Sequence, residues 1–102
     1  MTTTSGSALD ELDPVLTAPK RLAIMAVLAS SASTDFPFLR DHLGVSDSDL
    51  SKQASALEAA GYLRISKSGR GRGASTSYQA TKAGKAAYRR HREALRRLLA
   101  DD

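Results

Sequence analysis

The sequence contains no cysteine and no tryptophan, and its 102 residues include only two phenylalanines and three tyrosines. Without cysteine, disulfides, a thiolate nucleophile and thiolate metal ligands are excluded. Long apolar runs are lacking too: the longest, Leu22–Ala29, falls far short of the roughly 18 residues that a membrane-spanning helix needs. The first residues, Met1–Ala8, have neither the basic nor the apolar region of a secretory signal. These absences predict a soluble, cytoplasmic protein of one domain, without membrane association.

Acidic residues are scarce in the second half of the chain. Residues 1–61 carry four basic side chains against eight acidic ones, whereas residues 62–97 carry eleven basic side chains and a single acid, Glu93. The formal net charge of the whole chain is +4. Such an asymmetry indicates a nucleic acid or another acidic surface as the partner. The alternative is a solvated basic helix face that only keeps the protein soluble.

No group of residues has the spacing of a catalytic or metal site. His42 follows Asp41, but neither a second histidine nor a cysteine stands at ligand spacing. The glycine-rich segment Ser68–Gly73 lacks the pattern of a nucleotide-binding loop. An Arg–Gly segment of this kind can also bind RNA, although the aromatic residues that stack on single-stranded bases are missing. We therefore expect no enzyme activity, no metal and no cofactor.

Capping and turn residues divide the chain into predicted elements. Residues 1–11 are rich in Thr, Ser and Gly and are expected to form a disordered tail. Helices are expected at about 18–29 (with Thr17 as its cap), 38–43, 47–60 (with Ser46 as its cap) and 82–100 (with Thr81 as its cap). Phe36 is expected in a short edge strand, and residues 62–66 and 76–80 are expected to pair as a hairpin.

The order of these elements predicts the fold. A short helix that stops at Gly44, followed by a helix with Leu50, Ala54 and Leu57 on one stripe, is typical of a helix-turn-helix. A hairpin with arginine and glycine at its tip then makes the unit a winged helix. The predicted fold class is α+β, mainly α: a winged helix-turn-helix with a C-terminal dimerisation helix. The domain is expected to span 12–102, with the recognition helix at about 47–60, the wing at about 62–80 and the dimerisation helix at about 82–100.

These residues also resemble a known family over about 12–95. The resemblance lies in the segments Leu12–Leu16, Arg21–Met25, Phe36–Gly44, Leu50–Gln53, Leu57–Tyr62 and Tyr78–Gly84. They are similar to the stand-alone bacterial and archaeal winged-helix DNA-binding family, which is related to the MarR, ArsR and PadR repressors. The resemblance implies transcriptional regulation by a homodimer on duplex DNA. Relatives often carry basic residues where this chain has Ser55 and Ala56, which weakens the expected recognition helix.

Two groups of residues are expected to contact DNA. The recognition helix would place its outward face in the major groove, where hydroxyl, amide and ammonium groups reach bases and phosphates. Its candidate residues are Ser46, Ser48, Ser51, Lys52, Gln53 and Ser55. The wing would place arginines in the minor groove, where the potential of narrow A·T-rich segments is most negative. Its candidate residues are Arg64, Lys67, Arg70 and Arg72.

The last predicted helix carries a seam at heptad spacing. Gly84, Tyr88, His91, Leu95 and Leu98 recur every three or four residues, as in a helix that packs on a partner. A small domain has no other place to bury both this seam and the apolar segment Leu22–Ala29. We therefore expect a two-fold dimer interface that contains Leu22, Met25, Tyr88, His91, Leu95, Leu98 and Leu99. The alternative is that these side chains pack inside their own subunit.

The sequence thus predicts a homodimeric, sequence-specific DNA-binding transcriptional regulator in the cytoplasm, associated with the nucleoid. Its expected partners are double-stranded DNA and a second copy of the chain. A small-molecule effector, of unknown identity, would have to bind in the dimer cleft. Two alternatives stay open: a low-specificity architectural DNA-binding protein, and a protein-interaction winged helix whose basic face meets an acidic protein.

Overall fold

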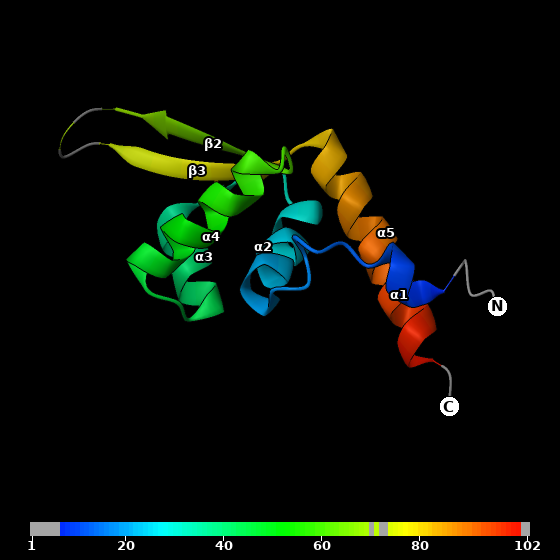
Figure 1. Cartoon of the computed structure of the whole chain (residues 1–102). Helices are drawn as coiled ribbons and strands as arrows, with labels where there is room; N and C mark the ends of the chain where they lie inside the picture. Colours follow the sequence, from blue (N-terminus) through cyan, green and yellow to red (C-terminus); the bar gives the residue numbers. More distant parts are fainter. Residues whose placement is uncertain (1–6, 70, 72–73, 101–102) are drawn as a thin grey trace.

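The computed structural model describes residues 7–69, 71 and 74–100, which form a mainly helical winged helix with a small antiparallel sheet (Figure 1). In chain order its elements are α1 (Ala8–Glu11), α2 (Pro19–Ala29), β1 (Thr34–Asp35), α3 (Phe36–Leu43), α4 (Asp47–Ala59), β2 (Leu63–Ser68), β3 (Ser75–Ala80) and α5 (Lys82–Leu99). The predicted winged helix-turn-helix, of the α+β class and mainly α, is confirmed. Within these residues, no helix is long and apolar enough to cross a membrane.

The sheet has the order β1-β3-β2, and all its pairs are antiparallel. Because side chains alternate along a strand, Leu63, Ile65 and Lys67 share one face of β2, and Arg64 lies on the other. Leu63 is buried and Ile65 packs against the hydrophobic core, so their face is the one that the helices cover. The opposite face is polar and open. This alternation separates Lys67 from Arg64.

Side-chain caps start α3, α4 and α5. The hydroxyl of Ser46 accepts a hydrogen bond from the amide of Asp49, and the hydroxyl of Thr81 accepts one from the amide of Gly84, which confirms both predicted caps. The carboxylate of Asp35 accepts from the amide of Phe38 and starts α3 at Phe36. The edge strand is therefore Thr34–Asp35, and the expectation of Phe36 in that strand is wrong.

The helix-turn-helix has its predicted turn, but α2 begins without the predicted cap. Gly44 ends α3 with a φ of 68°, a left-handed conformation that glycine adopts without steric cost. The expectation that Thr17 caps α2 is wrong: its hydroxyl donates to the carbonyl of Pro14, and α2 follows Ala18, which makes no side-chain cap. Pro19 at the start of α2 needs no amide partner because proline has no N–H group.

The core lies between α2 and the helix-turn-helix. Ile24, Met25 and Leu28 of α2 pack with the predicted stripe of α4, which is Leu50, Ala54 and Leu57. The sheet closes this core with Leu63, Tyr78 and Ala80. Burial of large aliphatic side chains is the main source of stability in a domain of this size.

α5 leads away from this core, and the hairpin points to the opposite end of the molecule (Figure 1). α1 lies beside the C-terminal half of α5, where Glu11 forms an ion pair with Arg97. Residues 7–11 thus differ from the expected disordered tail, because Ser7 caps a helical turn that packs on α5. The rest of that predicted tail, residues 1–6, lies outside the described residues.

The start of α5 is fixed to the end of α4. The amide of Thr81 donates to the carbonyl of Tyr62, and its hydroxyl donates to the carbonyl of Gly61 at 2.7 Å. Gly84 lies against the same peptide: a Cβ atom there would be 2.1 Å from the carbonyl oxygen of Tyr62. The lack of a side chain at this position therefore allows α5 to approach the α4–β2 junction.

Candidate nucleic-acid interface

The outward face of α4 carries small hydroxyl groups and one cation. Ser48, Ser51, Lys52 and Ser55 are all exposed, away from the buried stripe of the helix. Ser51 and Ser55 lie on the side of this face that is next to the hairpin. Ser46 is exposed as well, but its hydroxyl is committed to the amide of Asp49 as the helix cap. The face is therefore free of bulky side chains and can approach the edges of bases closely.

Each of the two acids in the first turn of α4 is paired with a cation from another helix. Asp49 forms an ion pair with Lys20 of α2, and Asp47 forms one with Arg40 of α3 at 3.0 Å. The hydrogen bond from Lys20 lowers the pKa of Asp49, and Gln53 adds to the effect. Arg40 also holds Asp41 at 2.9 Å, and these two carboxylates raise its pKa. The acids thus contribute much less negative potential to this face than their sequence position indicates.

Gln53 belongs to the packing between α2 and α4. Its side-chain oxygen accepts a hydrogen bond from Arg21 at 3.1 Å, and its amide nitrogen donates to Asp49 at 3.1 Å. Arg21 in turn donates to the carbonyl of Val15 at 2.7 Å. The side chain expected to read adenine is therefore engaged inside the subunit, where it holds the recognition helix on α2.

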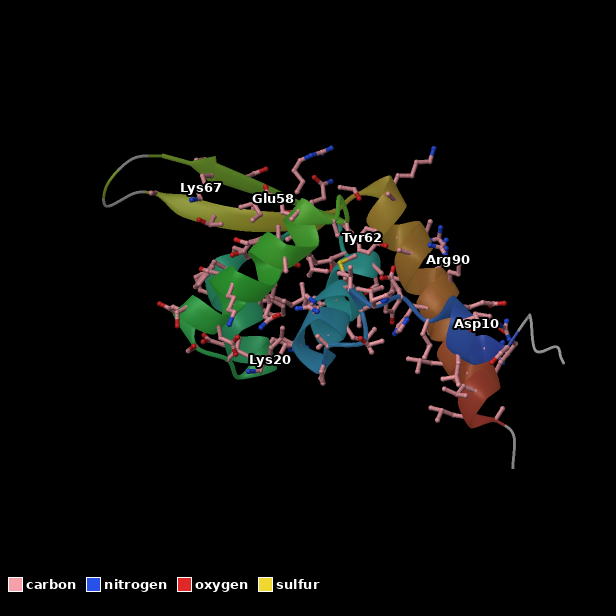
Figure 2. All side chains as sticks on the ribbon, viewed as in Figure 1. Asp10, Lys20, Glu58, Tyr62, Lys67 and Arg90 are labelled. Carbon is pink, nitrogen blue, oxygen red and sulfur yellow. The ribbon has the colours of Figure 1, made fainter. Side chains whose placement is uncertain are left out.

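The structure separates the basic residues expected on the wing. Lys67 lies on the face of the hairpin that looks toward α4 (Figure 2). Arg64 lies on the opposite face, because side chains alternate along β2. A duplex seated on α4 would therefore lie nearer to Lys67 than to Arg64. Arg70 and Arg72 lie outside the described residues.

Between α4 and the hairpin the surface is hollowed. The hollow has a volume of about 140 Å³. It is lined by Phe36, Ser51, Ser55, Ile65, Lys67, Thr76 and Tyr78. Thr76 was missed by the sequence analysis, although its place opposite Lys67 in the hairpin follows once the register of the strands is known.

A second, largely apolar groove runs between α2 and α5. Its volume is about 360 Å³, and it is lined by Pro19, Leu22, Ala23, Ala26, Tyr88, Arg92 and Leu95. Arg92 lies over the ring of Tyr88, with its guanidinium carbon 5.7 Å from the ring centre. Leu22, Tyr88 and Leu95, all expected in a dimer interface, meet at this groove.

The other residues expected in the dimer interface separate into two groups. Leu98 is half-buried and Leu99 is 74% exposed at the end of α5, where a partner can reach them. Met25 and His91 are buried within their own subunit, so their assignment to a dimer interface is wrong. Leu9 of α1, 61% exposed, is an apolar surface residue that the sequence analysis placed in the disordered tail.

His91 is part of a polar network that joins three segments. Its Nδ1 atom accepts a hydrogen bond from the amide of Asp13 at 2.9 Å. The carboxylate of Asp13 accepts from the amide of Val15 and, at 2.5 Å, from the hydroxyl of Tyr62. Tyr62 lies between the end of α4 and α5 (Figure 2). Burial lowers the pKa of His91, and the hydrogen bond to Asp13 raises the pKa of Tyr62.

In the described part of the chain, no three His, Asp or Glu side chains come together as a metal site. His42, the candidate next to Asp41, stacks on the exposed ring of Phe38 with 5.5 Å between ring centres.

A helix-turn-helix whose second helix, α4, has an exposed hydroxyl-rich face, with a wing beside it, is the arrangement of a DNA-binding winged helix. A family model described as a winged helix DNA-binding domain matches residues 20–99, and the chain belongs to this family. The family is one of DNA-binding domains and not of enzymes. A search of curated proteins finds no match.

Solved structures with this fold include transcriptional regulators of the MarR family. A transcriptional regulator homologue from Pyrococcus horikoshii OT3 has a TM-score of 0.84 at 23% identity, over 91% of this chain and 94% of the other. NadR, solved in complex with 4-hydroxyphenylacetate, has a TM-score of 0.68 at 18% identity, over 98% and 82% of the two chains. ZitR from Lactococcus lactis, a zinc-responsive MarR family member, has a TM-score of 0.61 at 13% identity, over 80% and 56%.

Proposed function

We propose that this chain is a homodimeric transcriptional regulator that binds double-stranded DNA. In each half-site, α4 enters the major groove and the hairpin reaches into the adjacent minor groove. The observation that carries the proposal is the outward face of α4, on which Ser48, Ser51, Lys52 and Ser55 are exposed while the two first-turn acids are paired elsewhere. Such a face presents donors and acceptors to base edges with little electrostatic repulsion of the phosphates.

The shape of the subunit supports a dimer. Its Cα radius of gyration is 15.5 Å, whereas a compact domain of this length has about 13 Å. The molecule extends beyond its core at both ends, with the hairpin at one end and α5 with α1 at the other (Figure 1). The apolar groove between α2 and α5 stays open to a partner. A second copy of α5 in that groove would cover Leu22, Tyr88 and Leu95. By two-fold symmetry it would also set the two recognition helices about one turn of DNA apart.

An effector would act at the same place. NadR is a regulator of this fold that binds 4-hydroxyphenylacetate. For this chain we propose that an effector enters the dimer cleft formed along α2 and α5, where its binding would change the spacing of the two recognition helices.

The experiment that tests the proposal is selection of bound duplexes from a random DNA pool by the purified protein at physiological salt. An enriched inverted repeat with half-site centres about 10 base pairs apart is the expected result. Enrichment of A·T content without a repeat would replace the proposal by the architectural alternative. A protein that retains no duplex at all would favour an acidic protein partner. Sedimentation of the protein alone tests the dimer separately.

A further inference from the structure

The hollow between α4 and the hairpin is formed by two elements with complementary surfaces. Lys67 of β2 and Thr76 of β3 are direct cross-strand partners, and the next pair toward the core is Ile65 with Tyr78. The covered face of the hairpin therefore changes from apolar to polar at the hollow. On α4, Ser51 and Ser55 are one helical turn apart and lie on the side that faces this polar pair.

The side chains around the hollow leave room for a ligand. Serine and threonine are short, so α4 and the hairpin do not fill the space of about 140 Å³ between them. A water molecule in the liquid occupies roughly 30 Å³, which makes the hollow several times larger than one water. Its floor is formed by Phe36, Ile65 and Tyr78, of which Tyr78 is buried.

The polar lining fits an oxyanion. The hydroxyls of Ser51, Ser55 and Thr76 can donate hydrogen bonds there, in addition to the hydroxyl of Tyr78. Lys67 supplies a positive charge, and the lining contains no carboxylate. In the described part of the chain Lys67 forms no ion pair, and the acids at the start of α4 are paired with Lys20 and Arg40. A cationic ligand would be repelled by Lys67, and a neutral one would leave its charge unmatched.

We propose that this hollow binds one phosphate of the DNA backbone, held jointly by Ser51 and Ser55 of α4 and by Lys67 and Thr76 of the hairpin. This inference rests on the proposed function and adds a defined contact to it. A phosphate held from both sides fixes the angle between recognition helix and wing on the duplex. Contacts of this kind set the register of a protein on DNA without reading its sequence.

The test uses the selected duplex with its phosphates replaced one at a time by neutral methylphosphonates. Wild-type protein is expected to lose about tenfold in affinity at one phosphate in each half-site, since that position loses charge-assisted hydrogen bonds. A Lys67→Gln, Thr76→Val variant is expected to bind the unmodified duplex about tenfold more weakly and to lose nothing further at that phosphate. The slope of log affinity against log salt concentration should be smaller by about one for this variant, because one cation fewer contacts the DNA backbone.

The matched control carries the same kind of change on the other face of the hairpin. Arg64→Gln with Ser66→Ala removes a cation and a hydroxyl from β2, away from α4. This variant is expected to keep the wild-type pattern of methylphosphonate sensitivity. Because changes in the hairpin can disturb the wing itself, Ser55→Ala on α4 is measured too, and it should reduce the penalty at the same phosphate.

The outcomes separate three cases: failure of the phosphate contact alone, failure of the proposed function, and binding of a free anion in place of DNA. If duplex is bound but no phosphate is coupled to Lys67 and Thr76, the inference fails and the proposed function stands. If wild-type protein binds no duplex, both fail. Titration with inorganic phosphate, followed by the amide resonances of Lys67 and Thr76, covers a free anion. Submillimolar binding that displaces DNA would show that the hollow serves a free anion and would overturn the inference.

Discussion

Gly84 occupies a position in α5 where the usual rule for glycine in a helix is reversed. Replacement of a helical glycine by alanine normally stabilises a protein by about 1 kcal/mol, because glycine loses more conformational freedom on folding. Here the added Cβ would lie 2.1 Å from the carbonyl oxygen of Tyr62, which itself accepts a hydrogen bond from Thr81. The backbone on both sides is fixed, so the clash outweighs the gain.

We therefore expect Gly84→Ala to lower the free energy of unfolding by about 2 kcal/mol, within the range of overpacking substitutions. Chemical denaturation at a fixed protein concentration measures the change. Ala86→Gly, at an exposed position of the same helix, is the control and should cost only about 1 kcal/mol. A stabilised Gly84→Ala protein would show that α5 can move away from the α4–β2 junction.

His91 makes the stability of the fold depend on pH. Its Nδ1 atom accepts a hydrogen bond from Asp13, so the neutral ring is the form that fits, and burial lowers its pKa below the ordinary value of 6.5. Below pH 6.5 the unfolded chain binds a proton that the folded chain does not. The contribution of the neutral His91 ring to the free energy of unfolding is therefore complete above pH 6.5. It is lost as the pH falls from 6.5 toward the lower pKa that the ring has in the folded state.

The expected result is a decrease in the free energy of unfolding between pH 7 and pH 5 that is larger in wild type than in His91→Asn. Parallel denaturation series at both ends of this range give the difference. His42→Asn, which changes the exposed histidine of α3, should keep the wild-type dependence. Equal slopes in wild type and His91→Asn would mean that the ring does not titrate as its contacts indicate.

At the scale of elements, the ion pair between Lys20 of α2 and Asp49 of α4 matters more for DNA than for folding. Ion pairs at the surface add little to stability. Without Lys20, however, Asp49 would present an unpaired negative charge in the first turn of the recognition helix, next to the expected path of the phosphates. The pair therefore makes an acidic helix start compatible with a polyanionic ligand.

We expect Lys20→Ala to weaken binding of the selected duplex about fivefold while thermal stability changes little, since surface charges act mainly on association with a charged partner. Lys20→Ala combined with Asp49→Ala should recover most of the affinity. Titrations at two salt concentrations measure both effects. If the double variant binds no better than the single one, Lys20 contacts the DNA itself.

The helix-turn-helix and the wing also differ in how their charges are used. One cation from each of α2 and α3 pairs with an acid of α4: Lys20 with Asp49, and Arg40 with Asp47. On the hairpin, Lys67 faces the hollow without such a partner in the described part of the chain. In the proposed function, α2 and α3 would therefore neutralise the acids at the start of α4, and the hairpin would supply positive charge to the DNA backbone.

At the scale of the whole molecule, the exposed large apolar side chains lie on two separate surfaces. Leu9 and Leu99 belong to α1 and α5, which pack side by side, whereas Phe38 belongs to α3. Leu99 follows Leu95 of the α2–α5 groove by one helical turn and continues its apolar surface in the proposed dimer. Phe38 lies on the helix-turn-helix and stacks on His42.

Leu99→Glu is therefore expected to convert the dimer to monomers at micromolar concentration and to weaken binding of the selected inverted repeat more than tenfold, because one subunit alone engages one half-site. Sedimentation velocity measures the first effect. Phe38→Glu places the same charge at a comparably exposed apolar residue and should leave the oligomeric state unchanged. Loss of the dimer in both variants would mean that the interface is not along α5.

Local sequence determined the elements of this protein. Ser46 and Thr81 have side chains that cap a helix, Gly44 accepts a left-handed turn, and the stripe Leu50, Ala54 and Leu57 can be buried on one side only. These preferences act over a few residues, so they can be read without knowledge of the rest of the chain. They were enough to predict the winged helix and its basic, hydroxyl-rich face.

Tertiary packing decided what each side chain on those elements does. His91 satisfies the heptad spacing of a dimer seam, yet Asp13, 78 residues away along the chain, holds it inside the subunit. Gln53 lies at the edge of the outward face of α4, yet Arg21 of α2 engages it. Alternation along β2 gives the face on which Lys67 lies, yet only the pairing of β2 with β3 brings Thr76 next to it. A periodic pattern gives the side of an element, but the neighbour on that side depends on contacts between distant segments.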